Sequence, residues 1–247
     1  MAAVLAAATV MAQPGGRGGM GGGPPGMSAS MAKFFGDNKA FTAKMEATMQ
    51  GPSQPSPMTM EMTMAMLDGK TRVESDVTKI KGGGMPANRI AQMKQMGMDK
   101  SAHILRPDQK MTYTVFPGKH AYLGMAMTEA EVADAMDTSK IEKTSLGKET
   151  IDGHACEKNK VTVTNDKGEK QDVLVWNATD LKNFPVQIQM EDQGNKITMK
   201  YSDIKLEKPD AKLFDPPAGF TKYDSFQAFM QGEMMKRPGG GGPPPPN

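Results

Sequence analysis

The sequence is poor in cysteine, with a single residue of this type, Cys156, among its 247 positions. One cysteine forms no intramolecular disulfide, so we expect the packed core alone to stabilise the fold. Because Cys156 lies far from the N-terminus, it also offers no site for the acylation that makes a lipoprotein. No segment approaches eighteen consecutive apolar residues, and we therefore expect no transmembrane segment.

Excess charge of either sign is also missing. Thirty basic residues stand against 28 acidic ones, which gives a net charge of +2. The basic residues form no block interleaved with aromatic residues, the pattern that follows a phosphate backbone, and aromatic residues make up only 6% of the chain. We therefore expect no nucleic acid as partner.

Catalytic motifs are absent as well. The sequence contains no G-x-S-x-G nucleophile elbow, no phosphate-binding P-loop and no H-E-x-x-H pair, and its carboxylates are scattered singly along the expected strands. We therefore expect a protein that is not an enzyme and needs no cofactor.

The two ends of the chain differ in composition from its middle. Residues 1–12 are apolar, too short to span a bilayer, and end in the small-residue pattern that signal peptidase reads. We predict a signal peptide there, although its usual positive start is missing, and the alternative is a frayed apolar N-terminus. Residues 13–27 and 237–247 are rich in Gly and Pro and are expected to be disordered tails. One folded domain is expected between them, at residues 28–236, in a periplasmic or secreted protein.

Alternating apolar and polar residues dominate that domain and predict strands. The clearest run is MTMEMTMAM at residues 58–66, which leads into Asp68-Gly69, the pair that a type I′ hairpin favours. Strands are expected at 41–49, 58–66, 71–79, 101–105, 110–116, 120–125, 141–147, 154–164, 170–177, 184–191 and 196–206.

Helical periodicity occurs only in short segments: 31–35, 87–98, 129–137 and around Phe226, Phe229 and Met230. The best signalled of them is 129–137, because Thr128 and Glu131 form a capping box ahead of it. The predicted fold class is mainly β, an α+β arrangement in which one curved antiparallel sheet forms an open half-barrel. A few short helices would cover its concave side.

Twenty-five methionines need an explanation, and three remain open. The alternation at 58–66 is how any strand faces a core, with methionine in place of leucine or valine. Alternatively, flexible thioethers line a cavity for acyl chains; the candidates are Met45, Met58, Met60, Met62, Met64, Met66, Met93, Met111 and Met199. The third possibility is soft-metal binding by Met60, Met62 and Met64, since thioethers select Cu(I), but no histidine falls inside this run.

His154 and Cys156 lie two residues apart and so share one face of an expected strand. An imidazole and a thiol are two possible metal ligands, but two ligands do not make a closed site. The alternative is a packed Cys156 beside a solvent-facing His154. We therefore predict no metal centre here.

The most specific pattern lies in the C-terminal third of the chain. A strand ends at Trp176, Asp180-Leu181 and Phe184-Pro185 follow, and a later strand ends in Tyr-Ser-Asp-Ile before LFDPPAGF at residues 213–220. This pattern resembles the LolA/LolB-like superfamily, and more closely its bacterial branch known as the domain of unknown function 4412. The resemblance implies an unclosed barrel with an apolar concave face, which in the carrier members holds the acyl chains of lipoproteins.

Composition and resemblance together predict a monomeric envelope protein that holds a hydrophobic small molecule, a lipid or a lipoprotein acyl chain, with transient contacts to the envelope. The alternatives are a methionine-rich copper-handling protein and a structural envelope domain without a ligand.

Overall fold

The computed structural model describes residues 29–52, 56–83, 85–129, 131–132, 141–164, 170–192 and 194–235. The expected signal peptide at 1–12, the tails at 13–27 and 237–247, and most of the expected helix at 129–137 lie outside these residues. Those expectations stay predictions. No helix within the described ranges combines the length and apolar character that crossing a membrane requires.

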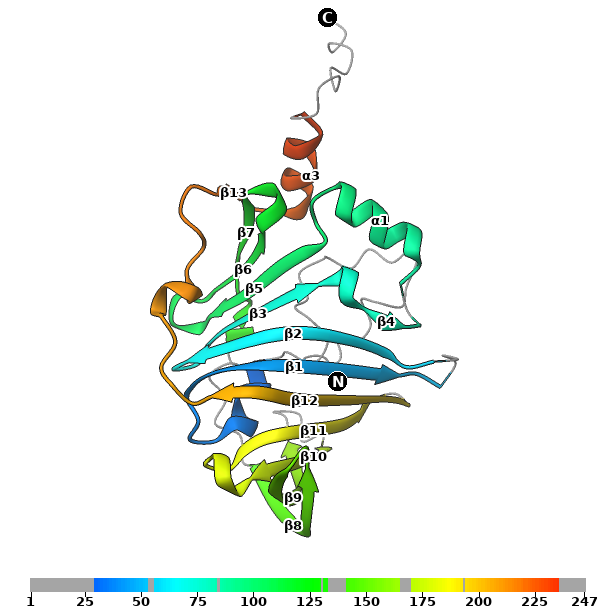
Figure 1. Cartoon of the computed structure of the whole chain (residues 1–247). Coiled ribbons are helices and arrows are strands. Elements are labelled where there is room, and N and C mark those ends of the chain that lie inside the picture. The colour runs from blue at the N-terminus through cyan, green and yellow to red at the C-terminus, as the bar shows by residue number, and fades with distance from the viewer. Residues whose placement is uncertain are drawn as a thin grey trace, which may run out of the picture.

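A single large sheet organises the described chain (Figure 1). Its strands are β1 (Ala40–Gln50), β2 (Met58–Leu67), β3 (Lys70–Asp76), β4 (Lys81–Gly82), β5 (Lys100–Arg106), β6 (Met111–Phe116), β7 (Ala121–Ala126), β8 (Ile141–Ile151), β9 (His154–Thr164), β10 (Lys170–Ala178), β11 (Phe184–Asp192), β12 (Asn195–Lys205) and β13 (Thr221–Tyr223).

The strand order is β13-β7-β6-β5-β3-β2-β1-β12-β11-β10-β9-β8, with β4 paired to β2 beside this path. Within the described residues the two terminal strands, β13 and β8, do not pair with each other, so the sheet stays open. The predicted curved, unclosed and mainly antiparallel sheet is therefore confirmed. The prediction missed one pair, because β13 runs parallel to β7.

The hairpin between β2 and β3 has the predicted geometry. Asp68 and Gly69 both have positive φ angles, 49° and 82°, which a type I′ turn requires at its two central positions. Because the turn fixes the register, Met64 lies opposite Val73 and Met62 opposite Ser75. All the methionines of β2 therefore point to one side of the sheet.

Short helices punctuate the sheet: η2 (Ala29–Phe35), η3 (Val77–Lys79), α1 (Ala87–Gln95), η4 (Pro107–Gln109), η5 (Pro117–Lys119), η6 (Thr179–Leu181), η7 (Ala211–Phe214) and α3 (Phe226–Met235). We call the face on which η2 packs the inner face, and the opposite one the outer face. In Figure 1, η2 lies behind β1 and β12, so the viewer looks at the outer face. α3 packs Phe229 against Phe116 and Leu123, beside the end of the sheet.

The predicted capping box ahead of residue 129 is confirmed. The Thr128 backbone N–H donates to Glu131 Oε2 at 2.7 Å, and the Glu131 backbone N–H donates to Thr128 Oγ1 at 3.2 Å. Each side chain thus satisfies a backbone donor that the first helical turn leaves unpaired.

The segment at residues 206–220, which we call the strap, crosses the outer face before β13. Its Phe214 is fully buried in a cluster with Ala102 and Ile104 of β5. Arg106 holds the strap by donating to the Phe214 carbonyl at 3.2 Å and by an ion pair with Asp215. The outer face is therefore covered at β3, β5 and β6, while η2 covers the inner face.

Candidate ligand-binding face

The inner face carries a continuous apolar wall across β2, β1, β12 and β11. Cα register places Met58, Met60, Met62 and Met64 of β2 opposite Met49, Ala47, Met45 and Ala43 of β1, and places Ile197, Met199 and Tyr201 of β12 on the other side of β1. Ile188 and Met190 of β11 continue the row. We call this row the methionine wall. Because strand side chains alternate between faces, the whole wall is one surface.

The methionine wall is packed. Each methionine from Met58 to Met66 is 5% exposed or less, and Met45 and Met199 are 1% and 0% exposed. The wall belongs to one cluster that also contains Met31 and Phe35 of η2. These sulfurs therefore pack in the core, as the first of the three explanations expects. Thioether side chains are also flexible enough to repack around a bound molecule.

An aromatic cluster joins η2 to the wall. The Phe35 ring centroid lies 4.7 Å from that of Phe41 and 5.5 Å from that of Tyr201, and Phe184 lies 4.9 Å from Phe41. Offset and edge-on arrangements at such distances stabilise a core beyond the area they bury. η2 is thereby fixed over the β1–β12 part of the wall.

Tyr201 brings an unpaired polar atom into this apolar surface. Its side chain is buried, and its hydroxyl makes no hydrogen bond in the described part of the chain. Burial raises the pKa of the Tyr201 phenol, so the group stays a neutral donor. A buried donor without an acceptor costs about 1–3 kcal/mol, and an acceptor atom on a bound molecule would recover this cost.

Beyond β2 the inner face also carries polar side chains. Ser75 of β3 and Ser101 of β5 share a hydrogen bond of 3.0 Å between their hydroxyls, and Thr114 of β6 lies 3.2 Å from Nδ1 of His103. Burial lowers the pKa of His103 to about 4, since desolvation disfavours the imidazolium. At neutral pH His103 is thus a neutral hydrogen-bonding group beside the methionine wall.

A pocket of about 230 Å³ opens on the inner face beside η2. Phe34 and Phe35 of η2, Val161 of β9 and Val175 of β10 form its apolar side. The same side chains belong to or pack against the cluster that contains the methionine wall. The apolar surface of the inner face therefore extends from the methionine wall into this pocket. We call it the η2 pocket.

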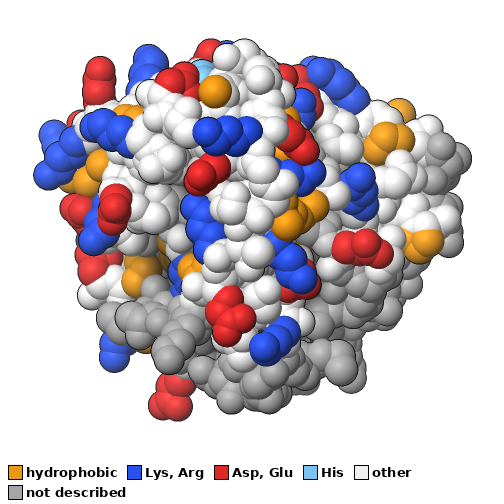
Figure 2. Space-filling model, turned by 90° about the horizontal axis from the view of Figure 1, so that it is seen from below, with side chains coloured by type: hydrophobic (Ala, Val, Ile, Leu, Met, Phe, Trp, Pro, Cys, Tyr) orange, Lys and Arg blue, Asp and Glu red, His pale blue; other side chains and the backbone are white. Residues whose placement is uncertain are grey.

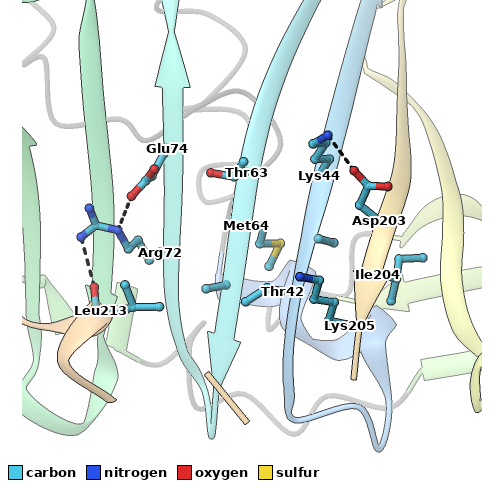
Figure 3. A pocket seen from close by; sticks show the side chains of 12 residues that line it. Thr42, Lys44, Thr63, Met64, Arg72, Glu74, Asp203, Ile204, Lys205 and Leu213 are labelled. Atoms are coloured by element: carbon cyan, nitrogen blue, oxygen red, sulfur yellow. Dashed lines mark hydrogen bonds and ion pairs between the residues drawn. The ribbon is translucent and has the colours of Figure 1, made fainter. Parts of the chain in front are cut away.

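A second, larger hollow of about 690 Å³ lies on the outer face (Figure 3). Lys44 pairs with Asp203 at 2.6 Å, Arg72 pairs with Glu74 at 2.8 Å, and Arg72 also donates to the Leu213 carbonyl of the strap at 3.1 Å. Its walls combine these paired charged groups with apolar residues such as Ala65, Ile204 and Leu213. We call this hollow the outer groove.

Charge is mixed elsewhere on the surface too. Figure 2 shows Lys, Arg, Asp and Glu side chains interspersed over the face seen from below, with hydrophobic side chains only in small separate groups. Among the described residues, Lys158 pairs with Glu149 at 2.7 Å and Lys160 with Asp172 at 2.6 Å.

Two predicted cavity residues lie away from the wall. Met111 stands opposite Arg106 and Ala126, in the register of the outer face, where Arg106 binds the strap. Met93 lies on α1, which buries none of its residues, and it is not part of the central cluster of described residues. The structure therefore does not bring these two methionines together with the other candidates. Neither alternation within one strand nor a helical stripe says which face of a sheet a residue joins.

The possible metal pair does not assemble. His154 Nδ1 lies 2.7 Å from Asp180 Oδ2, and Cys156 is buried with its thiol donating to the His154 carbonyl at 3.3 Å. Burial raises the pKa of the Cys156 thiol, which disfavours the thiolate that binds metals. Among the described residues, no three His, Cys, Asp or Glu side chains gather in a metal-binding group.

Comparison with known proteins now places the chain. A family model, the domain of unknown function DUF4412, matches residues 41–184, which is more than half of the sequence. The chain belongs to the DUF4412 family. The resemblance drawn from residues 173–220 is thus confirmed at the level of the family. No curated protein matches the chain.

Solved structures with a similar chain course share little sequence with this DUF4412 protein. A LolA superfamily protein from Nitrosomonas europaea is 15% identical, with coverage of 75% of this chain and 94% of that one and a TM-score of 0.38. Lipoprotein LppX from Mycobacterium tuberculosis is 9% identical over 71% and 93% of the two chains, with a TM-score of 0.40. LprF from Mycobacterium bovis is 12% identical over 74% and 93%, with a TM-score of 0.38.

Sequence reasoning missed the buried polar residues around the η2 pocket. The side chains of Asn38 and Asn177 donate to the carbonyls of Lys182 and Asn183 at 3.2 and 2.9 Å, and Asn159 donates to Asn177 at 3.1 Å. Lys182 and Asn183 both have positive φ angles, 53° and 56°. A Lys-Asn pair between two strands is a weak turn signal, so only the fold reveals that buried amides fix this turn.

Proposed function

We propose that this protein is a non-enzymatic binding protein of the bacterial envelope, periplasmic or secreted, which holds a lipid, an acyl chain or a similar hydrophobic ligand on the inner face of its open sheet. The observation that carries the proposal is the methionine run of β2, which lies wholly on the inner face of an unclosed sheet and is continuous with the apolar side of a pocket.

The physical basis is shielding from water. Each methylene of an acyl chain that leaves water contributes about 0.8 kcal/mol, so a few methylenes suffice for measurable affinity. Flexible thioethers adapt to chains of different length and shape. The unpaired Tyr201 hydroxyl supplies a hydrogen-bond donor for an ester or acid oxygen.

The test is native mass spectrometry of the full-length protein, purified from the envelope without detergent. The proposal predicts a retained mass in the lipid range that organic solvent releases. Cu(I) is then added under reducing conditions to the stripped protein. Stoichiometric copper on a protein that carries no lipid would support the copper-handling alternative. If the protein carries neither lipid nor copper, the result supports the other alternative, a structural domain with a filled core.

A variant with Met60, Met62 and Met64 all replaced by leucine separates the two kinds of ligand. Leucine keeps the volume and the apolar surface, so an acyl probe should bind within about threefold of its wild-type affinity. Any copper bound through these sulfurs should be lost, because leucine has no donor atom. A matched control replaces Met93, Met111 and Met235, which lie outside the wall.

A further inference from the structure

The rim of the η2 pocket carries positive charge. Lys143 of β8 and Lys182 of the turn after η6 both line it, together with Lys33 of η2, and Asp37 is the one carboxylate among its lining residues. Lys143 and Lys182 are exposed, and neither ammonium pairs with a carboxylate of the described chain. Lys158 and Lys160 of the adjoining β9 are paired, to Glu149 and Asp172.

The position of Lys182 is fixed by the fold. Its carbonyl accepts from the buried Asn38 side chain, and the carbonyl of the next residue, Asn183, accepts from the buried Asn177. These bonds hold two consecutive left-handed residues, a conformation that costs a non-glycine residue free energy. The turn therefore fixes the backbone of Lys182 beside the pocket.

Lys143 lines the same pocket from β8. It stands opposite Val161 in the β8–β9 register, and Val161 stands opposite Val173 on the inner face. The pocket thus has an apolar side formed by Phe34, Val161 and Val175 and a cationic rim. Its volume of about 230 Å³ equals roughly eight water molecules at about 30 Å³ each, enough for a head group and a few methylenes but not for a long chain.

We propose that the η2 pocket selects amphiphiles with an anionic head, a carboxylate or a phosphate, which Lys143 and Lys182 bind while the chain continues along the methionine wall. This inference rests on the proposed function and names the ligand class of the same face. Long apolar chains account for the affinity, and the two ammonium groups account for the preference among heads.

The test compares probes of equal chain length on the stripped full-length protein. Dodecanoate and dodecyl phosphate, each below its micelle concentration, and dodecanol, below its solubility limit, are titrated by calorimetry at low and at high salt. Exposed ion pairs are weak, so each lysine should favour the anionic probes about fivefold and the pair about tenfold or more at low salt, with a smaller preference at high salt. The ratio of dodecanoate to dodecyl phosphate affinity identifies the preferred head.

The variant Lys143→Gln/Lys182→Gln should lose this preference and bind dodecanol as the wild type does. A Lys205→Gln/Lys208→Gln control, which removes the same charge from exposed sites outside the pocket, should keep the preference. Equal wild-type affinities for all three probes would overturn the inference and leave the proposed function standing. A preference that survives in the pocket variant would also overturn it. If none of the probes binds, the proposed function fails and this inference with it.

Discussion

On β2 the inner face carries methionines from Met58 to Met66, whereas the outer face carries Thr59, Glu61 and Thr63. The inner side chains join one apolar cluster, and the outer ones belong to a surface of ion pairs such as Lys81–Glu61 at 2.7 Å. The two faces of the same strand therefore meet different environments, the apolar core on one side and water on the other. The inner face of this strand is therefore a continuous apolar surface, whereas the outer face is polar and lies beside the residues that hold the strap.

The outer face departs from this rule under the strap. Phe214 is fully buried there, and Arg106, which is only 9% exposed, holds the Phe214 carbonyl and pairs with Asp108 and Asp215. The hydrogen bond from Arg106 keeps the pKa of the Asp108 carboxyl below its usual value. The strap therefore covers the outer face at β5, next to the outer groove.

The largest loss of stability is expected when the strap is no longer anchored. Phe214→Ala removes a fully buried ring from a cluster of the outer face, which should lower the free energy of unfolding by about 3–5 kcal/mol. Leu213→Ala, at the neighbouring exposed position, is the control and should cost far less. Urea denaturation followed by circular dichroism measures both. Equal losses for the two variants would show that the strap is not anchored through Phe214.

Acid should destabilise the protein through His103 on the inner face. Its folded pKa of about 4 lies below the value near 6.5 of the unfolded chain, so between these values the unfolded state binds more protons. Stability is therefore fully present above pH 6.5 and falls towards pH 4. Between pH 7 and pH 4.5 His103 should account for a loss of about 2 kcal/mol in the free energy of unfolding.

The variant His103→Gln isolates that contribution from the carboxylates that titrate in the same range. Denaturation curves at both pH values should show a smaller acid loss for the variant than for the wild type. An identical loss in the two proteins would mean that His103 is solvated in the folded state.

Tyr201→Phe tests whether the unpaired hydroxyl serves a ligand. Removing a buried donor that has no acceptor should raise the free energy of unfolding of the ligand-free protein by about 1 kcal/mol. The same change should weaken the binding of dodecanoate severalfold, because its oxygen loses a donor. Thermal unfolding and calorimetry give the two values. A destabilised variant with unchanged affinity would show that the hydroxyl has a partner within the protein.

The smallest effect is expected from the exposed ion pair of the outer groove. Lys44 and Asp203 lie 2.6 Å apart, and both are well exposed. Solvent and salt screen such a pair, so Lys44→Gln/Asp203→Asn should leave the urea midpoint unchanged within error and acyl binding intact. Weakened acyl binding in this variant would indicate that the ligand site lies on the outer face and not on the inner face.

Local patterns predicted much of the fold. Period-two alternation assigned the faces of β2, Asp68-Gly69 predicted its hairpin, and Thr128 with Glu131 predicted a capping box, because each of these signals acts over a few residues.

The remaining features depend on contacts between distant segments. Phe214 of the strap packs against β5, and Asn38 donates to Lys182, which lies 144 residues away in the sequence. Neither contact produces a periodic pattern in the sequence. For the same reason Met111 could not be assigned to a face from its own strand alone.

The most direct test uses the methionines themselves. The full-length protein, labelled with ¹³C at the methionine methyl groups and stripped of lipid, is titrated with dodecanoate and followed by NMR, with resonances assigned by single Met→Leu variants. The account predicts shifts for wall residues such as Met45, Met62 and Met199 and unchanged signals for Met111 and Met235. Shifts confined to methionines outside the wall, or none at saturating probe, would contradict the claim that the inner face binds hydrophobic ligands.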